Sequence, residues 1–160
     1  MIVDKVTGDD GAAIDRIAQA TAATVDVAAE LARPWALFWV ARRTHGLEPI
    51  AFLLAWAVAD ELHLIHVATH PDARREGAAR ALMTVLLDHA MHNKTRLVLL
   101  EVRRSNRAAT HLYRAFGFSR IGVRRAYYAD GEDAVEMMLA FDPVTGRAEP
   151  GHDEAGVSDA

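Results

Sequence analysis

A carboxylate inside an apolar segment is the first feature of this sequence that could do chemistry. Glu101 lies in the run VLLEV at 98–102. Because side chains alternate between the faces of a β-strand, Glu101 is expected on the face opposite Val98, Leu100 and Val102. Burial there would raise the pKa of a carboxyl group toward neutrality, which suits a general base. The alternative is a structural glutamate held by an arginine across the sheet, and Arg103 could oppose the rise in pKa.

A short turn before an amphipathic segment is the second candidate. It reads RREGAAR and fits the spacing R/Q-x-x-G-x-G/A, with small residues at Gly77 and Ala79. Small residues let a phosphate approach the main chain, and the N–H groups and dipole of a following helix attract it. We therefore expect phosphate contacts from Arg74, Arg75, Glu76, Gly77, Ala78, Ala79 and Arg80. The same pattern is also typical of a solvated helix start, so the spacing alone leaves both interpretations open.

Asn106 and Tyr113 lie seven residues apart in a segment that predicts a helix. This spacing places both side chains on nearly the same helical face, where they can line one groove. Tyr113 can equally be a core aromatic with a satisfied hydroxyl group, and Asn106 or Ser105 can be an N-cap. A structural role and a functional role are compatible for both residues.

The histidines His63, His66 and His70 are close in sequence but do not predict a metal site. On a strand, His63 and His66 point to opposite faces, and no cysteine or clustered carboxylate completes a ligand set. We expect exposed or capping roles for them and no bound metal.

Hydrophobic periodicity predicts a mixed α/β fold. Strands are expected at 2–6, 36–42, 49–59, 61–69, 97–103, 118–123 and 134–141. Helices are expected from Asp9 and Asp10 through Ile14, Ile17, Val25 and Leu31, and at 78–92 and 106–116. Gly117 is expected to mark a bulge between the last helix and the next strand. Residues 1–142 should form one domain, and 143–160, rich in Pro, Gly and acidic residues, a disordered tail.

Composition narrows the function classes. The chain has 160 residues, 51% of them hydrophobic, which is enough for a single core. It has no cysteine, which excludes disulfides, thiolate metal sites and a cysteine nucleophile. The net charge of −4 disfavours a dedicated nucleic-acid binder, although Arg-Arg pairs are present. No long apolar run and no basic leader with an apolar core are seen, so we expect a cytoplasmic protein without membrane contact.

The segment from about Glu61 to Leu139 resembles the GNAT superfamily of N-acetyltransferases. The resemblance rests on the turn described above and on the pattern L-E-V-R-x-S-N-x-x-A-x-x-L-Y-x-x-x-G-F, which begins at Leu100. The residues Arg124-Arg125-Ala126-Tyr127-Tyr128 and Asp133-Ala134 are similar to those of the RimI-like branch, the ribosomal-protein alanine N-acetyltransferases. The N-terminal third matches only in its order of elements.

The resemblance implies a fold and a set of roles. The fold is a twisted, mostly antiparallel sheet of about seven strands with about four helices, in which two central parallel strands splay apart to admit acetyl-CoA. It implies that Glu101 is the general base and Tyr113 the general acid, and that Asn106 binds the pantetheine arm. Main-chain contacts to the acetyl and pantetheine groups are implied at Val67, Ala68 and Thr69. The acceptor would lie against Arg125, Tyr127 and Tyr128, beside Arg124.

The expected reaction is direct acetyl transfer from acetyl-CoA to a primary amine in a ternary complex. The branch implies the N-terminal α-amine of a protein, specifically alanine-led and from the small ribosomal subunit. Acetylation of a small molecule or of lysine is an alternative, and so is an acetyl-CoA-binding module without activity. A monomer or a homodimer is expected.

Overall fold

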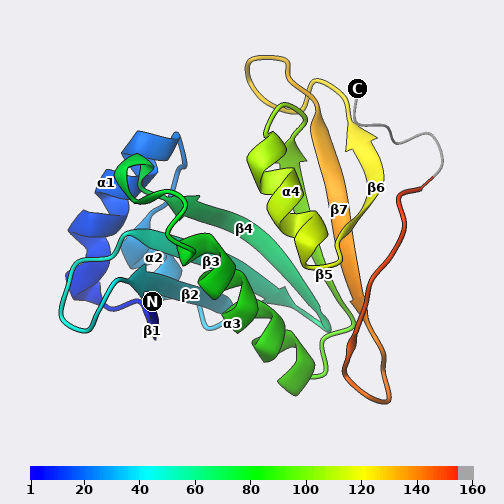
Figure 1. Ribbon diagram of the computed structural model, residues 1–160, viewed down its shortest axis with the longest axis horizontal. Coiled ribbons are helices and arrows are strands. Elements are labelled where there is room, and N and C mark those ends of the chain that lie inside the picture. The colour runs from blue at the N-terminus through cyan, green and yellow to red at the C-terminus, as the bar shows by residue number, and fades with distance from the viewer. Residues whose placement is uncertain (155–160) are drawn as a thin grey trace. The chain divides into compact units, whose positions relative to one another are not determined.

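The computed structural model describes residues 1–154 (Figure 1). The chain divides into two compact units. Unit 1 comprises Met1–Val58 and Leu64–His89, and unit 2 comprises Ala59–His63 and the chain from Ala90 onward. Each unit has its own network of contacts.

The elements confirm the mixed α/β class. The strands are β1 Ile2–Lys5, β2 Ala36–Arg42, β3 Ala51–Val58, β4 Glu61–Thr69, β5 Leu97–Arg103, β6 Ser119–Arg124, β7 Ala134–Phe141 and β8 Ala148–Glu149. The helices are α1 Gly11–Thr21, α2 Val27–Leu31, α3 Ala78–His92 and α4 Arg107–Ala115, with the 3-10 turns η1 Gly8–Asp10 and η2 Pro71–Ala73. Within residues 1–154, no helix combines the length and the hydropathy that crossing a membrane requires.

The strands follow the order β1-β2-β3-β4-β5-β7-β6, and β8 pairs with β7. The sheet is mostly antiparallel, and β4 and β5 form its parallel pair. This arrangement confirms the sheet that the resemblance implied. The opening of β4 from β5 to admit a cofactor stays a prediction.

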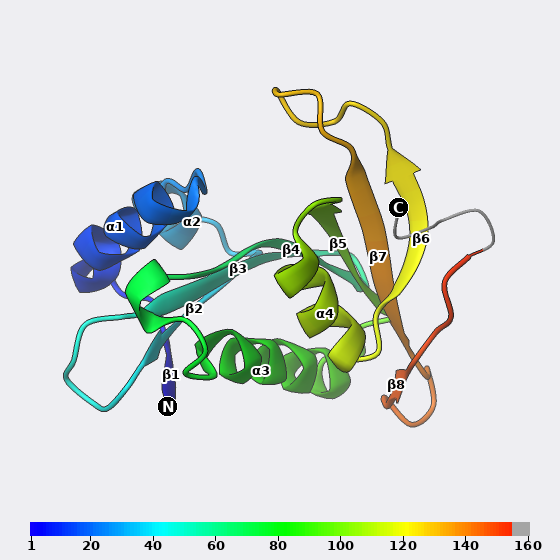
Figure 2. The same cartoon turned by 45° about the horizontal axis from the view of Figure 1, so that its top comes forward.

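In unit 1, helices cover both faces of β2 and β3 (Figure 2). On one face α1 and α2 bury an apolar cluster with side chains from β2 and β3, among them Ile14, Ile17, Phe38 and Phe52. On the other face Trp39 of β2 meets His89 of α3, with ring centroids 5.9 Å apart. Because helices bury both faces of β2 and β3, the sequences of these strands are continuous apolar runs.

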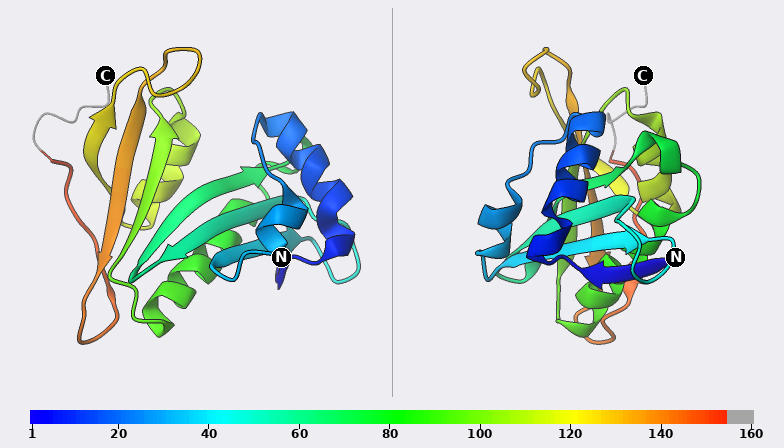
Figure 3. Two further views of the ribbon diagram at one scale, coloured as in Figure 1. Left: turned by 180° about the vertical axis from the view of Figure 1, so that it is seen from behind. Right: turned by 90° about the vertical axis from the view of Figure 1, so that its left-hand side faces the viewer.

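In unit 2, α4 lies along one face of β5 and β7 (Figure 1; Figure 3, left). Tyr113 from this helix is buried and packs on Phe118, with ring centroids 5.9 Å apart. Val98, Leu100 and Val102 of β5 are also buried. The apolar face of β5 is therefore the one that the alternation predicted.

The N-terminal helix is shorter than predicted. A single helix through Leu31 is wrong, because α1 ends at Thr21 and Ala22 adopts a left-handed conformation with φ of 55°. Val25 lies between the two helices, and Asp26 starts α2 by accepting a hydrogen bond from the Ala29 N–H at 3.0 Å. Asp10 does not cap α1 through its side chain, which instead accepts a hydrogen bond from the Thr7 N–H at 3.0 Å.

The disordered tail is wrong for residues 143–154. The chain turns back after β7, and β8 pairs with it through Ala140↔Glu149 and Phe141↔Ala148. Further along, Asp153 accepts hydrogen bonds from the Arg120 N–H at 3.0 Å and from Arg114 at 2.5 Å. The rest of the predicted tail lies outside the described residues.

Gly117 does not form the predicted bulge. It follows α4 with φ of +95°, and its N–H donates to the Arg114 carbonyl at 3.0 Å, so it ends the helix. A Cβ atom there would lie 3.2 Å from Pro150. The irregularity in this region is a shift of register in β6 between Arg120 and Gly122.

Candidate functional site

Glu101 lies on the predicted face of β5 but is not buried. The residues on either side of it are buried, while Glu101 is exposed and its side chain retains 31% of its accessible surface. The burial that was expected for this carboxylate is therefore wrong. The strand instead presents Glu101 on an open face, where an incoming group can reach it.

The arginine that approaches Glu101 comes from β6 rather than from β5. Glu101 pairs across the ladder with Glu136 of β7, which places the two carboxylates side by side. Nε of Arg124 contacts Glu136 Oε1 and lies 3.5 Å from Glu101 Oε1. Hydrogen bonding to Glu136 first, and then the charge of Glu101, raises the pKa of Arg124. The expected interference from Arg103 is not seen, since Arg103 pairs with Asp130 at 2.9 Å and Glu132 at 3.1 Å.

The two predicted acceptor tyrosines lie beside this carboxylate pair. Hydrogen bonding to Glu101 and the charge of that carboxylate raise the pKa of the Tyr127 hydroxyl. Burial raises the pKa of Tyr128, and the charge of Glu101 adds to the effect. The rings of Tyr127 and Tyr128 meet edge to face with centroids 5.1 Å apart. Glu101, Tyr127 and Tyr128 are thus brought together, as the predicted roles require.

Arginines hold the tyrosines in place. The guanidinium of Arg103 lies 4.0 Å from the centroid of the Tyr128 ring, and that of Arg124 lies 5.7 Å from the Tyr127 ring. Contacts of this kind combine stacking with cation–π attraction. Arg125, the third predicted acceptor residue, directly follows β6 and is exposed.

Tyr113 is the more buried of the two predicted catalytic residues. Its side chain is 6% exposed, and burial raises the pKa of its hydroxyl well above the ordinary value of 10.0, with a smaller contribution from Tyr128. The hydroxyl is therefore protonated over the whole physiological range. This state is the one that a general acid needs before it acts.

Asn106 is the N-cap of α4. Its Oδ1 accepts a hydrogen bond from the Ala109 N–H at 3.1 Å, which confirms the capping alternative. Ser105 does not share this role, because its N–H and its hydroxyl both donate to Glu132 Oε1. The contact of Asn106 with pantetheine stays a prediction.

In unit 1, the end of β4 leads directly into the predicted phosphate-binding turn. Ala68 is buried, while Val67 and Thr69 are partly exposed. After η2, two residues of the turn have left-handed backbones, Arg75 with φ of 66° and Gly77 with φ of +88°. The Gly77 carbonyl accepts the first bond of α3, from the Ala81 N–H at 3.0 Å. The turn therefore sits at the start of a 15-residue helix, as the spacing predicted.

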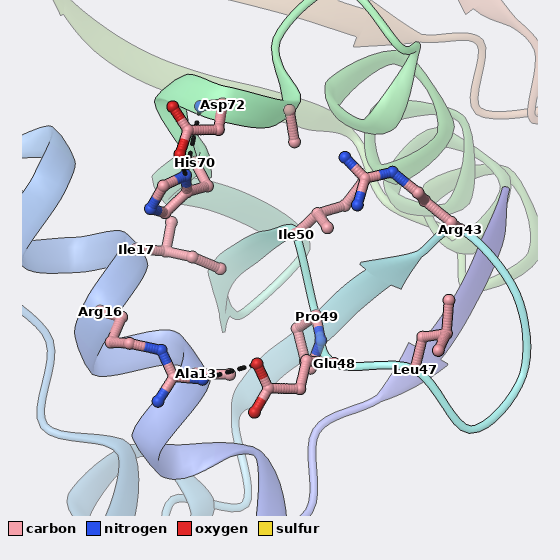
Figure 4. Close-up of a pocket in the computed structure, with 11 residues that line it drawn as sticks. Ala13, Arg16, Ile17, Arg43, Leu47, Glu48, Pro49, Ile50, His70 and Asp72 are labelled. Atoms are coloured by element: carbon pink, nitrogen blue, oxygen red, sulfur yellow. Dashed lines mark hydrogen bonds and ion pairs between the residues drawn. The ribbon is translucent and has the colours of Figure 1, made fainter.

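The turn is tied to the β2–β3 loop by an ion pair that the sequence did not predict. Arg43 donates from Nε and Nη2 to the two carboxylate oxygens of Glu76, both at 2.7 Å. Arg43 also lines a pocket of about 420 Å³ between α1, this loop and η2 (Figure 4). Arg16 and Glu48 form a second ion pair on the opposite wall, at 2.8 Å.

The three neighbouring histidines have separate partners. His63 contacts Glu61 at 2.9 Å, and His66 lies 2.9 Å from the Thr24 carbonyl. Nδ1 of His70 accepts the Asp72 N–H at 3.2 Å and so caps η2, which confirms the capping role. Within residues 1–154, no three His, Cys, Asp or Glu side chains gather as a metal site would require.

Residues 13–118 match the acetyltransferase (GNAT) family, and this match spans more than half of the sequence. The chain belongs to the GNAT family. The matched range includes the turn before α3, Glu101 and Tyr113.

Known relatives of this GNAT chain carry more specific names. The [ribosomal protein bS18]-alanine N-acetyltransferase of Escherichia coli is 42% identical over 92 residues, which are 56% of this chain and 62% of that protein. The N-alpha-acetyltransferase RimI of Mycobacterium tuberculosis is 45% identical over 78 residues, 48% of this chain and 46% of that protein. The matched segment thus spans less than two thirds of these relatives.

A solved structure extends the likeness over most of the fold. The crystal structure of the ribosomal-protein-S18-alanine N-acetyltransferase from Escherichia coli has a TM-score of 0.77 and 32% identity to this GNAT chain. The structural match covers 87% of this chain and 92% of the Escherichia coli chain. The RimI-like resemblance is confirmed.

The sequence analysis did not identify Glu136 or the contact of Arg124 with the two carboxylates. Glu136 interrupts the apolar run AVEMMLAF just as Glu101 interrupts its own, and this signal was available. Its partnership with Glu101 depends on the register of β5 and β7, which the sequence of one strand does not encode. The contact of Arg124 with both carboxylates depends on the same register.

Proposed function

We propose that this chain is an acetyl-CoA-dependent N-acetyltransferase that modifies the N-terminal α-amine of a protein. The finer proposal is an alanine-led protein of the small ribosomal subunit, acetylated in the cytoplasm. The observation that carries the proposal is the 42% identity to the [ribosomal protein bS18]-alanine N-acetyltransferase of Escherichia coli, in a chain of the GNAT family.

The turn of unit 1 has the properties that an acyl-CoA ligand needs. Gly77 has open space where a side chain would lie, since no atom comes within 4 Å of an added Cβ. The first N–H groups of a helix lack intrahelical partners and carry a partial positive charge. Arg74 and Arg75 are exposed beside them. A pyrophosphate fits this combination of main-chain donors, space and positive charge.

Acetyl-CoA supplies an acetyl group activated as a thioester. Glu101 accepts a proton from the acceptor ammonium, directly or through water, so that the neutral nitrogen can attack the thioester carbonyl carbon. As the new C–N bond forms and the C–S bond breaks, Tyr113 donates its proton to the leaving sulfur. The nitrogen then releases its surplus proton to water, and water returns a proton to the Tyr113 oxygen. The products are an N-acetylated chain and the free thiol, and no covalent intermediate on the protein is required.

The tyrosine pair supplies a wall for the acceptor. Tyr127 is 48% exposed and the pKa of its hydroxyl responds to Glu101, so we infer that a group that approaches the carboxylate also meets this ring. The guanidinium of Arg103 packs on the ring of Tyr128. We infer that an N-terminal alanine lies against Tyr127 with its amine toward Glu101, because an aromatic face suits a small apolar side chain.

The proposal is tested by competing acceptors at equal concentration. The purified chain would be incubated with acetyl-CoA and four amines. These are a peptide that begins with alanine, the same peptide blocked at its N-terminus but carrying a lysine, a polyamine, and an aminoglycoside. Mass spectrometry would follow the gain of one acetyl group. We expect the alanine-led peptide to be acetylated at its α-amine at the highest rate.

Each alternative predicts a different pattern in the same assay. A faster reaction of the blocked lysine peptide, the polyamine or the aminoglycoside would assign a side-chain or small-molecule acetyltransferase instead. Binding of acetyl-CoA without transfer to any of the four amines would favour a binding module. A chain that does not bind acetyl-CoA would contradict the proposal entirely.

A further inference from the structure

The ion pair of Arg43 and Glu76 places a carboxylate in the turn that we propose binds phosphate. From this geometry we propose that Arg43 is a positioning residue for acetyl-CoA. Arg43 neutralises the charge of Glu76, so that the turn can accept an anion. The inference rests on the proposed function. It adds a residue from the β2–β3 loop, far from the turn in sequence, to the determinants of cofactor affinity.

Glu76 is an unusual residue for an anion-binding turn. It lies one residue from Gly77 and two from the start of α3. A negative charge at a helix start stabilises the empty helix but competes with any other anion for the same N–H groups and dipole. Hydrogen bonding to Arg43 lowers the pKa of Glu76, so its carboxylate stays charged at neutral pH. Without a counterion, it would repel a phosphate.

Arg43 is arranged to supply that counterion. Nε and Nη2 bond the two oxygens of the carboxylate separately, at 2.7 Å each, so that both are occupied. Fork-to-fork pairing of this kind is geometrically specific and is not reproduced by lysine. Hydrogen bonding to Glu76 also raises the pKa of Arg43, which keeps the pair ionic.

The loop that carries Arg43 is itself braced. The preceding residue, Arg42, donates to Asp10 at 2.6 Å and to the Leu47 carbonyl at 2.8 Å. Arg42 thus anchors the β2–β3 loop to η1 and closes the loop on itself. Arg43 extends from this anchored position along the wall of the pocket (Figure 4). Its guanidinium is therefore already in place before a ligand arrives.

If Arg43 neutralises Glu76, the CoA affinity of Glu76→Gln should stay the same or rise. If the ion pair is only a mechanical brace, that affinity should fall. Arg43→Gln leaves an unneutralised carboxylate and should weaken CoA binding by about three- to tenfold. Glu76→Gln removes the repulsion and should bind CoA as well as the wild type or more tightly. In the double variant the two changes cancel, and the Kd should return to within about twofold of the wild type.

The test is a titration of each full-length variant with CoA, and separately with pantetheine, which lacks the phosphates. Arg16→Gln is the matched control, because Arg16 is an equally exposed arginine in an ion pair on the same pocket. Its affinity for CoA should not change. For Arg43→Gln, the loss should appear with CoA, shrink as salt is raised, and be absent with pantetheine. Thermal melting of each variant checks that the fold is retained.

Three results would overturn the inference. These are an unchanged CoA affinity in Arg43→Gln, a double variant as weak as Arg43→Gln alone, or a loss in Glu76→Gln equal to that in Arg43→Gln. The last pattern would identify a brace rather than a counterion. Failure of the wild type to bind CoA is a distinguishable outcome, because it would overturn the proposed function and this inference with it.

Discussion

Glu101 of β5 and Glu136 of β7 are direct cross-strand partners, with the guanidinium of Arg124 against both carboxylates. Like charges that face each other across a ladder destabilise it, and a shared cation removes that cost. Arg124 lies against Glu136 and 3.5 Å from Glu101. The arrangement holds the arginine mainly on Glu136 and leaves Glu101 accessible to an acceptor.

Arg124→Gln should lower the thermal midpoint by about 1–3 °C at low salt, because the two carboxylates lose their shared cation. The deficit should shrink as salt is raised, since these charges are exposed and screened. Arg124→Lys keeps the charge and should recover part of the loss. Arg125→Gln changes an exposed neighbour and serves as the control. Equal midpoints for Arg124→Gln and the wild type at low salt would contradict this interpretation.

Tyr113 should make stability fall at alkaline pH. In the unfolded chain it ionises near its ordinary pKa of 10.0, whereas burial keeps the folded hydroxyl protonated to higher pH. The folded state then holds one more proton than the unfolded state above pH 10. The stabilisation is therefore complete below that pH and is lost as pH rises, at about 1.4 kcal/mol per pH unit.

Urea unfolding of the wild type and Tyr113→Phe between about pH 9 and pH 11.5 measures this contribution. The difference in the free energy of unfolding between the wild type and Tyr113→Phe should change by about 1.4 kcal/mol per pH unit. Tyr127→Phe removes an exposed tyrosine and should retain most of the alkaline slope of the wild type. A Tyr113→Phe curve parallel to the wild type would show that Tyr113 is not buried.

Gly117→Ala should destabilise the fold by about 1–3 kcal/mol, because its φ of +95° strains a residue with a Cβ. The new methyl group would also lie 3.2 Å from Pro150. Gly122→Ala is the matched control, because its Cβ would meet only Glu136, at an ordinary 3.5 Å. If urea unfolding gave the two variants the same stability, the predicted strain and the contact with Pro150 would both be wrong.

The sequence predicts the regular elements of this fold closely. The bounds of β2, β4, α3, β5 and β7 match the predicted ranges, since each is set by a strong apolar period and a breaking residue. The face of Glu101 also follows from alternation alone. Its exposure does not, because exposure depends on what covers that face of the strand, and this is a tertiary property.

The errors share a physical cause. The break at Ala22 is a left-handed residue of a type that favours helices, and no local pattern announces it. The segment around Asp153 is held by Arg114 and Arg120, which are far away in sequence. The ion pair of Arg43 with Glu76 likewise joins a loop to a turn. Long-range polar contacts of this kind depend on register and loop conformation, which composition and periodicity do not specify.

We propose that Glu101 is the base for acetyl transfer to an N-terminal amine. The most direct measurement is the rate of acetylation of an alanine-led peptide by the wild type, Glu101→Gln and Glu136→Gln, with acetyl-CoA binding measured in parallel. The two variants make the same chemical change on neighbouring strands of one face.

If Glu101 is the base, Glu101→Gln should lose about 10²- to 10⁴-fold in kcat while it still binds acetyl-CoA, and Glu136→Gln should stay within about tenfold of the wild type. Equal rates for the wild type and Glu101→Gln, or a larger loss in Glu136→Gln, would contradict this role.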